Sequence, residues 1–299
     1  MSTSARATEV DETTSPDGEG SPERKRPGRR RRESKYTAHT ADKYELYQYA
    51  VQSPETDIEF VQHVYREING REPQHFREDF CGTAILCATW VRSGEDRTAE
   101  GYDLDLEPME WGKKHNLKPL GKAQERVHLY LQDARSEGER APDVRIAQNF
   151  SYWTFKERAV LLDYFQKAHA SLADDGIFVI DLWGGSETQD KMREKRKVDE
   201  GFTYIWDQGE YFPGSGDFTC KIHFKFKDGT RMNDAFVYEW RVWHLTELRD
   251  LFHEAGFTQV DSYFEQDDED DEDDGGGEYH LDNEGEHAAA WISYLVGQK

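Results

Sequence analysis

Short strand-like segments alternate with longer helix-like segments through the middle of this 299-residue chain, and this alternation restricts the fold more than any other feature. Strands that alternate with helices pair in parallel through right-handed crossovers. The pattern therefore predicts an α/β fold, a doubly wound, Rossmann-like and mostly parallel sheet. The expected strands are residues 76–80, 99–104, 127–131, 144–149 and 177–182, with helices from Ala84, from Glu107 and over 155–172.

The alternation stops after the fifth expected strand. Three runs of β-forming residues follow, separated by Pro-Gly and Asp-Gly turn sequences, so residues 183–243 are predicted to be an antiparallel insertion after strand five. A helix is expected over 245–255, with Glu247 in a capping-box position. The final antiparallel pair is predicted at 259–264 and 289–296. The three runs of the insertion lie near 202–206, 219–226 and 235–242.

Both ends of this pattern are flanked by polar sequence. Residues 1–35 carry nine Lys/Arg and seven Asp/Glu with almost no apolar side chains, too little to offset the entropy of ordering, so a disordered tail is predicted. Its arginine-rich run at 24–32 is also typical of nuclear-import or RNA-contact patches, which leaves that alternative open. Residues 36–76 show helical spacing and predict two helices. The run DDEDDEDD predicts a solvated acidic loop over 265–287.

Charge and cysteine content exclude several classes of function. The net charge is -23, and because the tail contributes about +2, the rest of the chain carries about -25 and would repel a phosphate backbone. A nucleic-acid partner is therefore disfavoured except through the tail. Three cysteines without a CxxC pair favour reduced thiols and a cytoplasmic location. We expect no membrane span, because no run approaches about 18 apolar residues, and no metal site. The oligomeric state is left open.

Acidic residues end the first three expected strands and indicate the kind of ligand. Glu78 precedes a turn that leads directly into a helix, where backbone amides approach a ligand closely. Asp103 ends the second strand, where a carboxylate accepts hydrogen bonds from both hydroxyls of a ribose, and Asp133 ends the third. A pyrophosphate would be repelled by Glu78, so a nucleotide-dependent oxidoreductase is the least favoured function. A cationic sulfonium with an amino-acid tail fits better.

From Arg77 to Lys299 the chain resembles the class I S-adenosylmethionine-dependent methyltransferases. The segment EDFCGTA matches the family's glycine-rich first motif, LADDGIFVIDL its fifth strand, and RVWHLTELRDLFHEAGF its late helix. The resemblance implies a seven-stranded sheet and S-adenosylmethionine as cofactor. The turn would hold the methionine part, Asp103 the ribose, Asp133 the adenine edge and Asn149 the floor beside the methyl group. The implied cofactor-binding residues are Glu78, Phe80, Cys81, Gly82, Thr83, Ala84, Asp103, Leu104, Gln132, Asp133, Ala134, Asn149 and Phe150.

The sequence departs from the family at the outer glycines of the first motif, where Phe80 and Ala84 stand. These side chains are expected to hinder a close backbone approach and to weaken or abolish cofactor binding. A non-catalytic protein that kept the fold, regulatory or S-adenosylmethionine-binding, is therefore one alternative. His244 stands where the late helix of the family usually has Ser or Thr as its cap.

The predicted domain organisation places a methyltransferase domain at 77–299, with the helices of 36–76 closing its site and the insertion at 183–243 acting as a substrate lid. Strand alternation makes Tyr204 and Trp206 candidates for an aromatic wall around a cationic or planar acceptor, and Arg241 a candidate for holding a carboxylate. Alternatively, the aromatic side chains are core and Arg241 forms a structural ion pair. No catalytic residue is assigned. The predicted reaction is transfer of a methyl group to nitrogen or oxygen of a small molecule, with RNA or protein methylation through the basic tail as an alternative.

Overall fold

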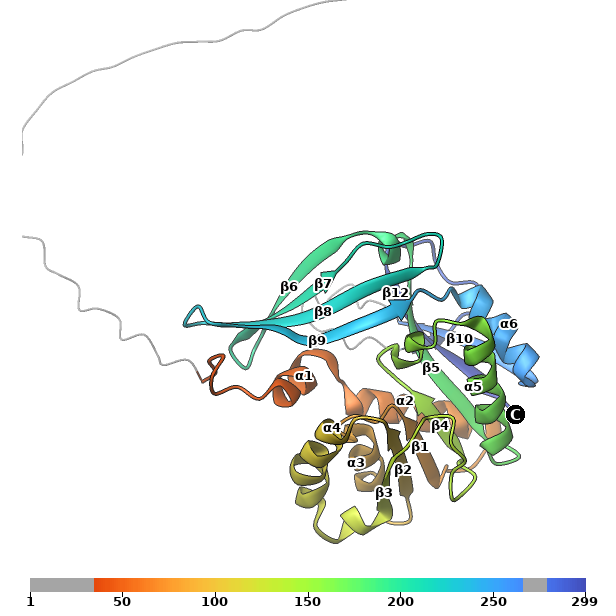
Figure 1. The fold of residues 1–299 in the computed structure, drawn as a ribbon. Helices are drawn as coiled ribbons and strands as arrows, with labels where there is room; N and C mark the ends of the chain where they lie inside the picture. The colour runs from red at the N-terminus through yellow and green to blue at the C-terminus, as the bar shows by residue number, and fades with distance from the viewer. Residues whose placement is uncertain (1–34, 266–278) are drawn as a thin grey trace, which may run out of the picture. The chain divides into compact units, whose positions relative to one another are not determined.

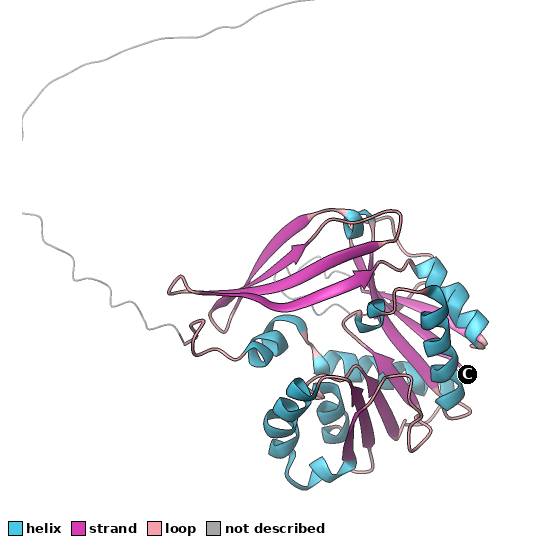
Figure 2. Cartoon of the chain, in the orientation of Figure 1, coloured by secondary structure: helices cyan, strands magenta, loops and turns pink. Residues whose placement is uncertain are grey.

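The computed structural model describes residues 35–265 and 279–299, so the predicted basic tail up to residue 34 and most of the predicted acidic loop lie outside the described residues. Within the described ranges, eight strands form one sheet in the order β11-β10-β12-β5-β4-β1-β2-β3. Four further strands form a second sheet in the order β6-β7-β8-β9 (Figures 1 and 2). No helix in these ranges is long and apolar enough to cross a membrane.

The large sheet is parallel in its central part, as the alternation predicts. The neighbours β1 and β4 pair in parallel, and the chain runs outward from β1 to β3 on one side and from β4 to β5 on the other. Such a change of direction opens a crevice at the carboxyl ends of the two neighbours, where α/β proteins bind ligands. The parallel strands are β1 (His75–Asp79), β2 (Thr98–Asp103), β3 (Val127–Leu131), β4 (Val144–Ala147) and β5 (Ile177–Gly184), and the antiparallel edge consists of β12 (Trp291–Gln298), β10 (Gln259–Glu265) and β11 (Tyr279–Leu281).

Helices cover both faces of this sheet, because its strands carry apolar side chains on both sides. Ile177 and Val179 of β5 pack in one core with side chains of α2 and α3, whereas Phe178 and Ile180 pack in another with α5 and α6. The doubly wound arrangement is therefore confirmed. The helices are α1 (Lys43–Val51), α2 (Pro54–Asn69), α3 (Ile85–Arg92), α4 (Leu106–Gly112), α5 (Arg158–Ser171) and α6 (Leu245–Ala255), with a π-helical turn at Lys113–Leu117 and 3₁₀ turns at Lys118–Arg126, Ser151–Thr154 and Ser186–Gln189.

Two strands correct the sequence-based expectation. The large sheet has eight described strands, because β11 pairs with β10 inside the stretch predicted to be an acidic loop. The second sheet has four described strands where three were expected, because β6 (Met192–Val198) pairs with β7 (Phe202–Gln208). The sequence of β6, MREKRKV, has no alternating apolar face to mark it as a strand. The other two strands are β8 (Asp217–Phe226) and β9 (Arg231–Arg241), and the pairing is antiparallel throughout.

Helix α1 joins the second sheet to the first turn of the large sheet. Leu46 and Ala50 of α1 are buried in one cluster with Phe202 and Phe224 of the second sheet. On the other side, Gln48 Nε2 donates a hydrogen bond to Thr83 Oγ1 at 3.0 Å. Helix α1 thus contacts both the insertion and the turn that follows β1 (Figure 1).

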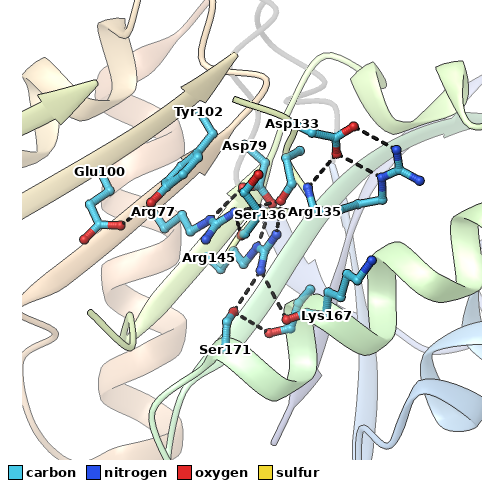
Figure 3. A network of polar contacts seen from close by, with 12 residues as sticks. Arg77, Asp79, Glu100, Tyr102, Asp133, Arg135, Ser136, Arg145, Lys167 and Ser171 are labelled. Carbon is cyan, nitrogen blue, oxygen red and sulfur yellow. Dashed lines mark hydrogen bonds and ion pairs between the residues drawn. The ribbon is translucent and has the colours of Figure 1, made fainter. Parts of the chain in front are cut away.

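A buried polar network fixes the carboxyl end of β1 (Figure 3). Asp79 accepts hydrogen bonds from Arg77 Nε at 2.8 Å and from Arg145 Nε at 2.6 Å, and none of the three side chains is exposed. Both arginines also donate to the carbonyl of Ala134, at 2.7 and 2.6 Å. Tyr164 Oη adds a bond to Asp79 at 2.8 Å. The network therefore ties β1, β4 and the segment after β3 together beneath the crevice.

Candidate cofactor site

The turn after β1 is formed despite its two departures from the family's glycines. Phe80, Gly82 and Ala84 all have left-handed backbone conformations, with φ angles of 56°, 48° and 54°. Glycine reaches such angles freely, whereas an L-residue is strained there by about 1–2 kcal/mol. Both residues therefore adopt the angles that glycine would, and the expectation that their side chains weaken cofactor binding stays a prediction.

Neighbouring elements hold the strained turn in place. Asp103 Oδ2 accepts the N–H of Gly82 at 2.7 Å, and Asn116 Nδ2 donates to the Thr83 carbonyl at 2.8 Å. Gly112 at the end of α4 lies so close that a Cβ there would stand 2.1 Å from the Thr83 oxygen. The turn is thus clamped between β2 and α4, and a side chain at position 112 would displace it.

Relief of the strain is testable at Ala84, which is fully buried. Ala84→Gly should leave the free energy of unfolding unchanged or raise it by up to about 1 kcal/mol, because relief of the backbone strain balances or outweighs the greater entropy of unfolded glycine. Ala88→Gly, inside α3, is the matched control and should lower it by about 1 kcal/mol or more. Urea unfolding measures both. Equal destabilisation by the two substitutions would show that position 84 carries no strain.

Two carboxylates face the turn. Glu78 is buried, and its Oε2 accepts the N–H of Cys87 in the first turn of α3 at 3.0 Å. Burial raises the pKa of Glu78 to about 8. Desolvation also raises the pKa of Asp103, against the opposing effect of the N–H groups of Asp105 and Gly82. A cation bound beside these groups would restore their charged forms.

A cavity of about 270 Å³, here called the cofactor cavity, opens at the crevice between β1 and β4. Two buried polar atoms of its lining residues, Gln52 Oε1 and Gln148 Nε2, have no hydrogen-bond partner. They would accept from an ammonium group and donate to a carboxylate respectively. The cavity is lined by the predicted residues Glu78, Phe80, Cys81, Gly82, Thr83, Asp103 and Asn149, and by others including Lys43, Tyr44, Tyr47, Gln52, Gln148, Phe236 and Tyr238 that the sequence did not indicate.

The floor of the crevice is a second strained turn. Asn149 and Phe150 have φ angles of 57° and 55°, and their N–H groups donate to the two oxygens of Asp181, at 2.7 and 3.0 Å. Asp181 lies in β5 with 8% of its surface exposed, and burial raises its pKa to about 8. Sequence reasoning missed Asp181. The signal available was a single acidic residue within the otherwise apolar run IFVIDLW.

The remaining predicted cofactor residues lie outside the lining of this cavity. Gln132 is exposed, and the carbonyl of Ala134 is taken by the buried arginines. Asp133 binds Arg135 through both oxygens at 2.8–2.9 Å, which lowers its pKa to about 2. Leu104 is 70% exposed and Leu131 51% exposed, although both are large apolar residues. Leu131 ends β3 opposite Asp103, the last residue of β2, and Leu104 directly follows Asp103, so both leucines lie beside Asp103 at this edge.

The acceptor-pocket candidates separate into two groups. Tyr204 and Trp206 line an adjoining cavity of about 220 Å³, here called the acceptor chamber, which also contains Phe150. Arg241 lies outside its lining: the guanidinium donates to the Lys156 carbonyl at 2.9 Å, pairs with Glu247 and stacks on the Trp243 ring. The guanidinium of Arg241 therefore makes its contacts within the fold. This arrangement agrees with the alternative that Arg241 is structural and not with a substrate contact.

No protein-family model matches the sequence, and no curated protein sequence matches it significantly. Solved structures do match. An S-adenosylmethionine-dependent methyltransferase from Clostridium acetobutylicum superposes on this chain with a TM-score of 0.60 at 15% sequence identity. The match covers 85% of this chain and 96% of that one. The chain has the fold of the S-adenosylmethionine-dependent methyltransferases.

Two further methyltransferases show the same fold. An amino pentose methyltransferase of calicheamicin biosynthesis from Micromonospora echinaspora matches with a TM-score of 0.62 at 15% identity, over 86% of this chain and 97% of that one. A sugar N-methyltransferase from Streptoalloteichus matches with a TM-score of 0.58 at 17% identity, over 86% and 92%. The methyltransferase fold thus covers 85–86% of this chain in each of the three comparisons.

Proposed function

We propose that this protein transfers a methyl group from S-adenosylmethionine to a nitrogen or oxygen of a small-molecule acceptor. The observation that carries the proposal is the cofactor cavity at the switch point between β1 and β4. It joins a turn of left-handed residues, two acidic strand ends and two unpartnered glutamine atoms. This set suits a ligand with a positive charge, a ribose and an amino-acid tail, and it offers nothing to a pyrophosphate.

The methionine and ribose parts of the cofactor have matching residues in the cavity, and the adenine has a matching surface beside it. Gln52 Oε1 and Gln148 Nε2 would pair with the ammonium and carboxylate of the methionine part, and Glu78 would balance its positive charge. Asp103 keeps free lone pairs on both oxygens for the ribose hydroxyls. The exposed edge of Leu104 and Leu131 would be covered by a flat adenine ring, with Asp133 at its rim.

Methyl transfer requires alignment more than a dedicated catalytic group. Bound S-adenosylmethionine supplies a methyl group on a positively charged sulfur. The acceptor's lone pair forms the new bond to that carbon, the S–C bond breaks with its electron pair remaining on sulfur, and the acceptor's proton leaves to a carboxylate or to water. The Asn149–Phe150 turn, fixed by Asp181, would hold the acceptor in line, and the insertion would exclude water.

The acceptor chamber is small, and residues of the insertion and of α1 enclose it, so it favours a small-molecule acceptor. The similar proteins act on an amino pentose and a sugar, as their names state. The three free cysteines are buried, and a reducing compartment suits them, so we place the protein in the cytoplasm. The domain roles follow: residues 36–76 close the site and the insertion at 183–243 acts as its lid.

Calorimetric titration with S-adenosylmethionine and, separately, with NADH tests the proposal. Micromolar binding of the methyl donor alone supports it, and no binding of the donor contradicts it. Deletion of residues 1–34 should leave methyl transfer to a small molecule intact. Loss of activity in that variant would favour the alternative in which the basic tail recruits RNA or protein. Binding without turnover across an acceptor screen would favour a regulatory protein.

Proton linkage provides a further expected result. Glu78 has a raised pKa of about 8 and is therefore mostly protonated at neutral pH, whereas a cationic ligand favours its ionised form. Binding should then release a proton, so affinity for S-adenosylmethionine should rise with pH, by at most about tenfold per unit, up to about pH 8 and level off above it. Titrations in two buffers of different ionisation enthalpy measure the release.

Two variants assign this proton. In Glu78→Gln the rise with pH should flatten, because the group that releases the proton is gone. Asp181→Asn is the matched control, because Asp181 is also buried with a pKa of about 8 but is engaged by the Asn149 and Phe150 amides. An unchanged slope in Glu78→Gln would show that the proton comes from another group.

A further inference from the structure

The acceptor chamber has the composition of an ammonium-binding site. Seven aromatic side chains line it, and among the described residues Glu194 is its one charged lining group. The rings come from α1, the floor turn, β5 and two strands of the insertion, β7 and β9. Aromatic faces attract cations, and a carboxylate at the rim adds direct charge attraction.

A larger cavity of about 770 Å³, here called the acidic groove, continues from this chamber. The two share Trp183, Glu194, Trp206 and Ile292, so they lie side by side. The groove is bounded by β6, β7 and the ends of β10 and β12. Its volume exceeds that of the chamber more than threefold, so an acceptor that filled only the chamber would leave it unused.

The charge of the groove is of one sign. Its carboxylates are Glu187, Glu194, Glu265, Asp282 and Glu286, and no lysine or arginine of the described ranges lines it. Two neighbouring cations of β6 and its approach are paired: Lys191 with Glu210 at 3.0 Å, and Arg193 with Asp207 at 2.8 Å. A third, Arg196, lies over the Tyr204 ring and lines the smaller cavity of about 310 Å³ beside the chamber, not the groove. A cleft lined by one sign of charge concentrates ligands of the opposite sign.

A third cavity of about 310 Å³ lies beside these spaces and shares Phe150 and Tyr204 with the acceptor chamber and Glu265 with the groove. Gln148 and Asn149 line both this cavity and the cofactor cavity, so it borders the proposed cofactor site as well as the acceptor spaces.

We propose that the acceptor carries at least two amino groups, of which one reacts in the acceptor chamber while another is held as an ammonium ion in the acidic groove. This rests on the proposed methyl transfer and names its substrate class. The two spaces suit different protonation states. The rings and Glu194 attract an ammonium ion into the chamber, where burial then favours loss of its proton and so the neutral amine that has a lone pair to donate. The carboxylates of the groove favour the charged form. The bond changes are those of the proposed reaction, with nitrogen as the acceptor atom.

The test is binding of amines to the full-length protein saturated with S-adenosylhomocysteine. The probes are butylamine, 4-amino-1-butanol, 1,4-diaminobutane and spermidine, titrated calorimetrically at about 150 mM salt, where long-range surface attraction is largely screened. We expect one site per chain, and we expect the diamine and spermidine to bind at least about tenfold more tightly than butylamine or the amino alcohol. Equal affinities for butylamine and 1,4-diaminobutane would overturn the proposal.

Paired variants separate the groove from the overall negative charge. Glu187→Gln/Glu286→Gln should reduce the preference for the diamine at least about threefold and leave butylamine unaffected. Glu125→Gln/Glu239→Gln makes the same charge change at exposed sites outside the groove lining and should preserve the preference. Equal effects of both pairs would mean attraction to the whole chain of charge -23 and would overturn the inference. Failure to bind S-adenosylhomocysteine would instead refute the proposed function itself, whereas its binding by each variant shows an intact fold.

Discussion

Asp79→Ala is expected to lower the free energy of unfolding by about 3–5 kcal/mol, the largest effect of any single substitution considered for this chain. Asp79 is the carboxylate between Arg77 and Arg145, and all three side chains are fully buried. Its removal leaves two guanidinium groups in the interior without their shared counter-ion, and Tyr164 loses its acceptor. Urea unfolding followed by circular dichroism measures the loss.

Two comparisons show whether the loss comes from the buried charges. Asp163→Ala removes a carboxylate from an exposed pair with Lys167 and should cost less than about 0.5 kcal/mol. The triple variant Arg77→Met/Asp79→Leu/Arg145→Met removes all three charges together and should lose less than Asp79→Ala. If Asp79→Ala does not fold, Asp79→Asn, which keeps one acceptor oxygen, should show an intermediate loss. A cost equal to that of Asp163→Ala would contradict the role of the network.

Asp103→Ala is expected to weaken binding of S-adenosylmethionine by about 100-fold or more. The variant removes two charge-assisted hydrogen bonds proposed to the ribose, each contributing about 1.5–3 kcal/mol, and about 1.4 kcal/mol corresponds to tenfold in affinity. It also leaves the Gly82 N–H without its acceptor, so the strained turn loses one of its supports. Calorimetric titration of the purified variant measures the change.

The matched control is Asp133→Ala, which also removes a carboxylate that follows a strand of the same sheet. Asp133 is occupied by Arg135 and lies outside the lining of the cofactor cavity, so its loss should weaken binding by about tenfold or less. Asp103→Asn should fall between the wild type and Asp103→Ala, because one acceptor oxygen remains. Unchanged affinity in Asp103→Ala would place the ribose elsewhere.

Sequence reasoning succeeded where the determining interactions are local. The parallel strands were found because apolar runs bounded by turns recur at regular spacing, and helix α6 begins and ends where its capping signals predict, at Leu245 and Ala255. It failed at β6 and β11. Strand β6 has no alternating apolar face, and β11 has only three residues, too few to show a pattern. Each pairs as an edge strand through its backbone, which leaves no trace in the side-chain pattern.

The same division holds at the candidate site. By itself the sequence determined the sheet and the acidic residues Glu78 and Asp103 at its edge, because parallel strands bring their carboxyl ends to one side. Only the tertiary structure decided that Phe80 and Ala84 adopt glycine-like angles, that Arg241 is used within the fold, and that Gln148 is left without a partner. These outcomes depend on which groups meet across the fold after distant segments pack together, and the spacing of residues along a chain does not encode those encounters.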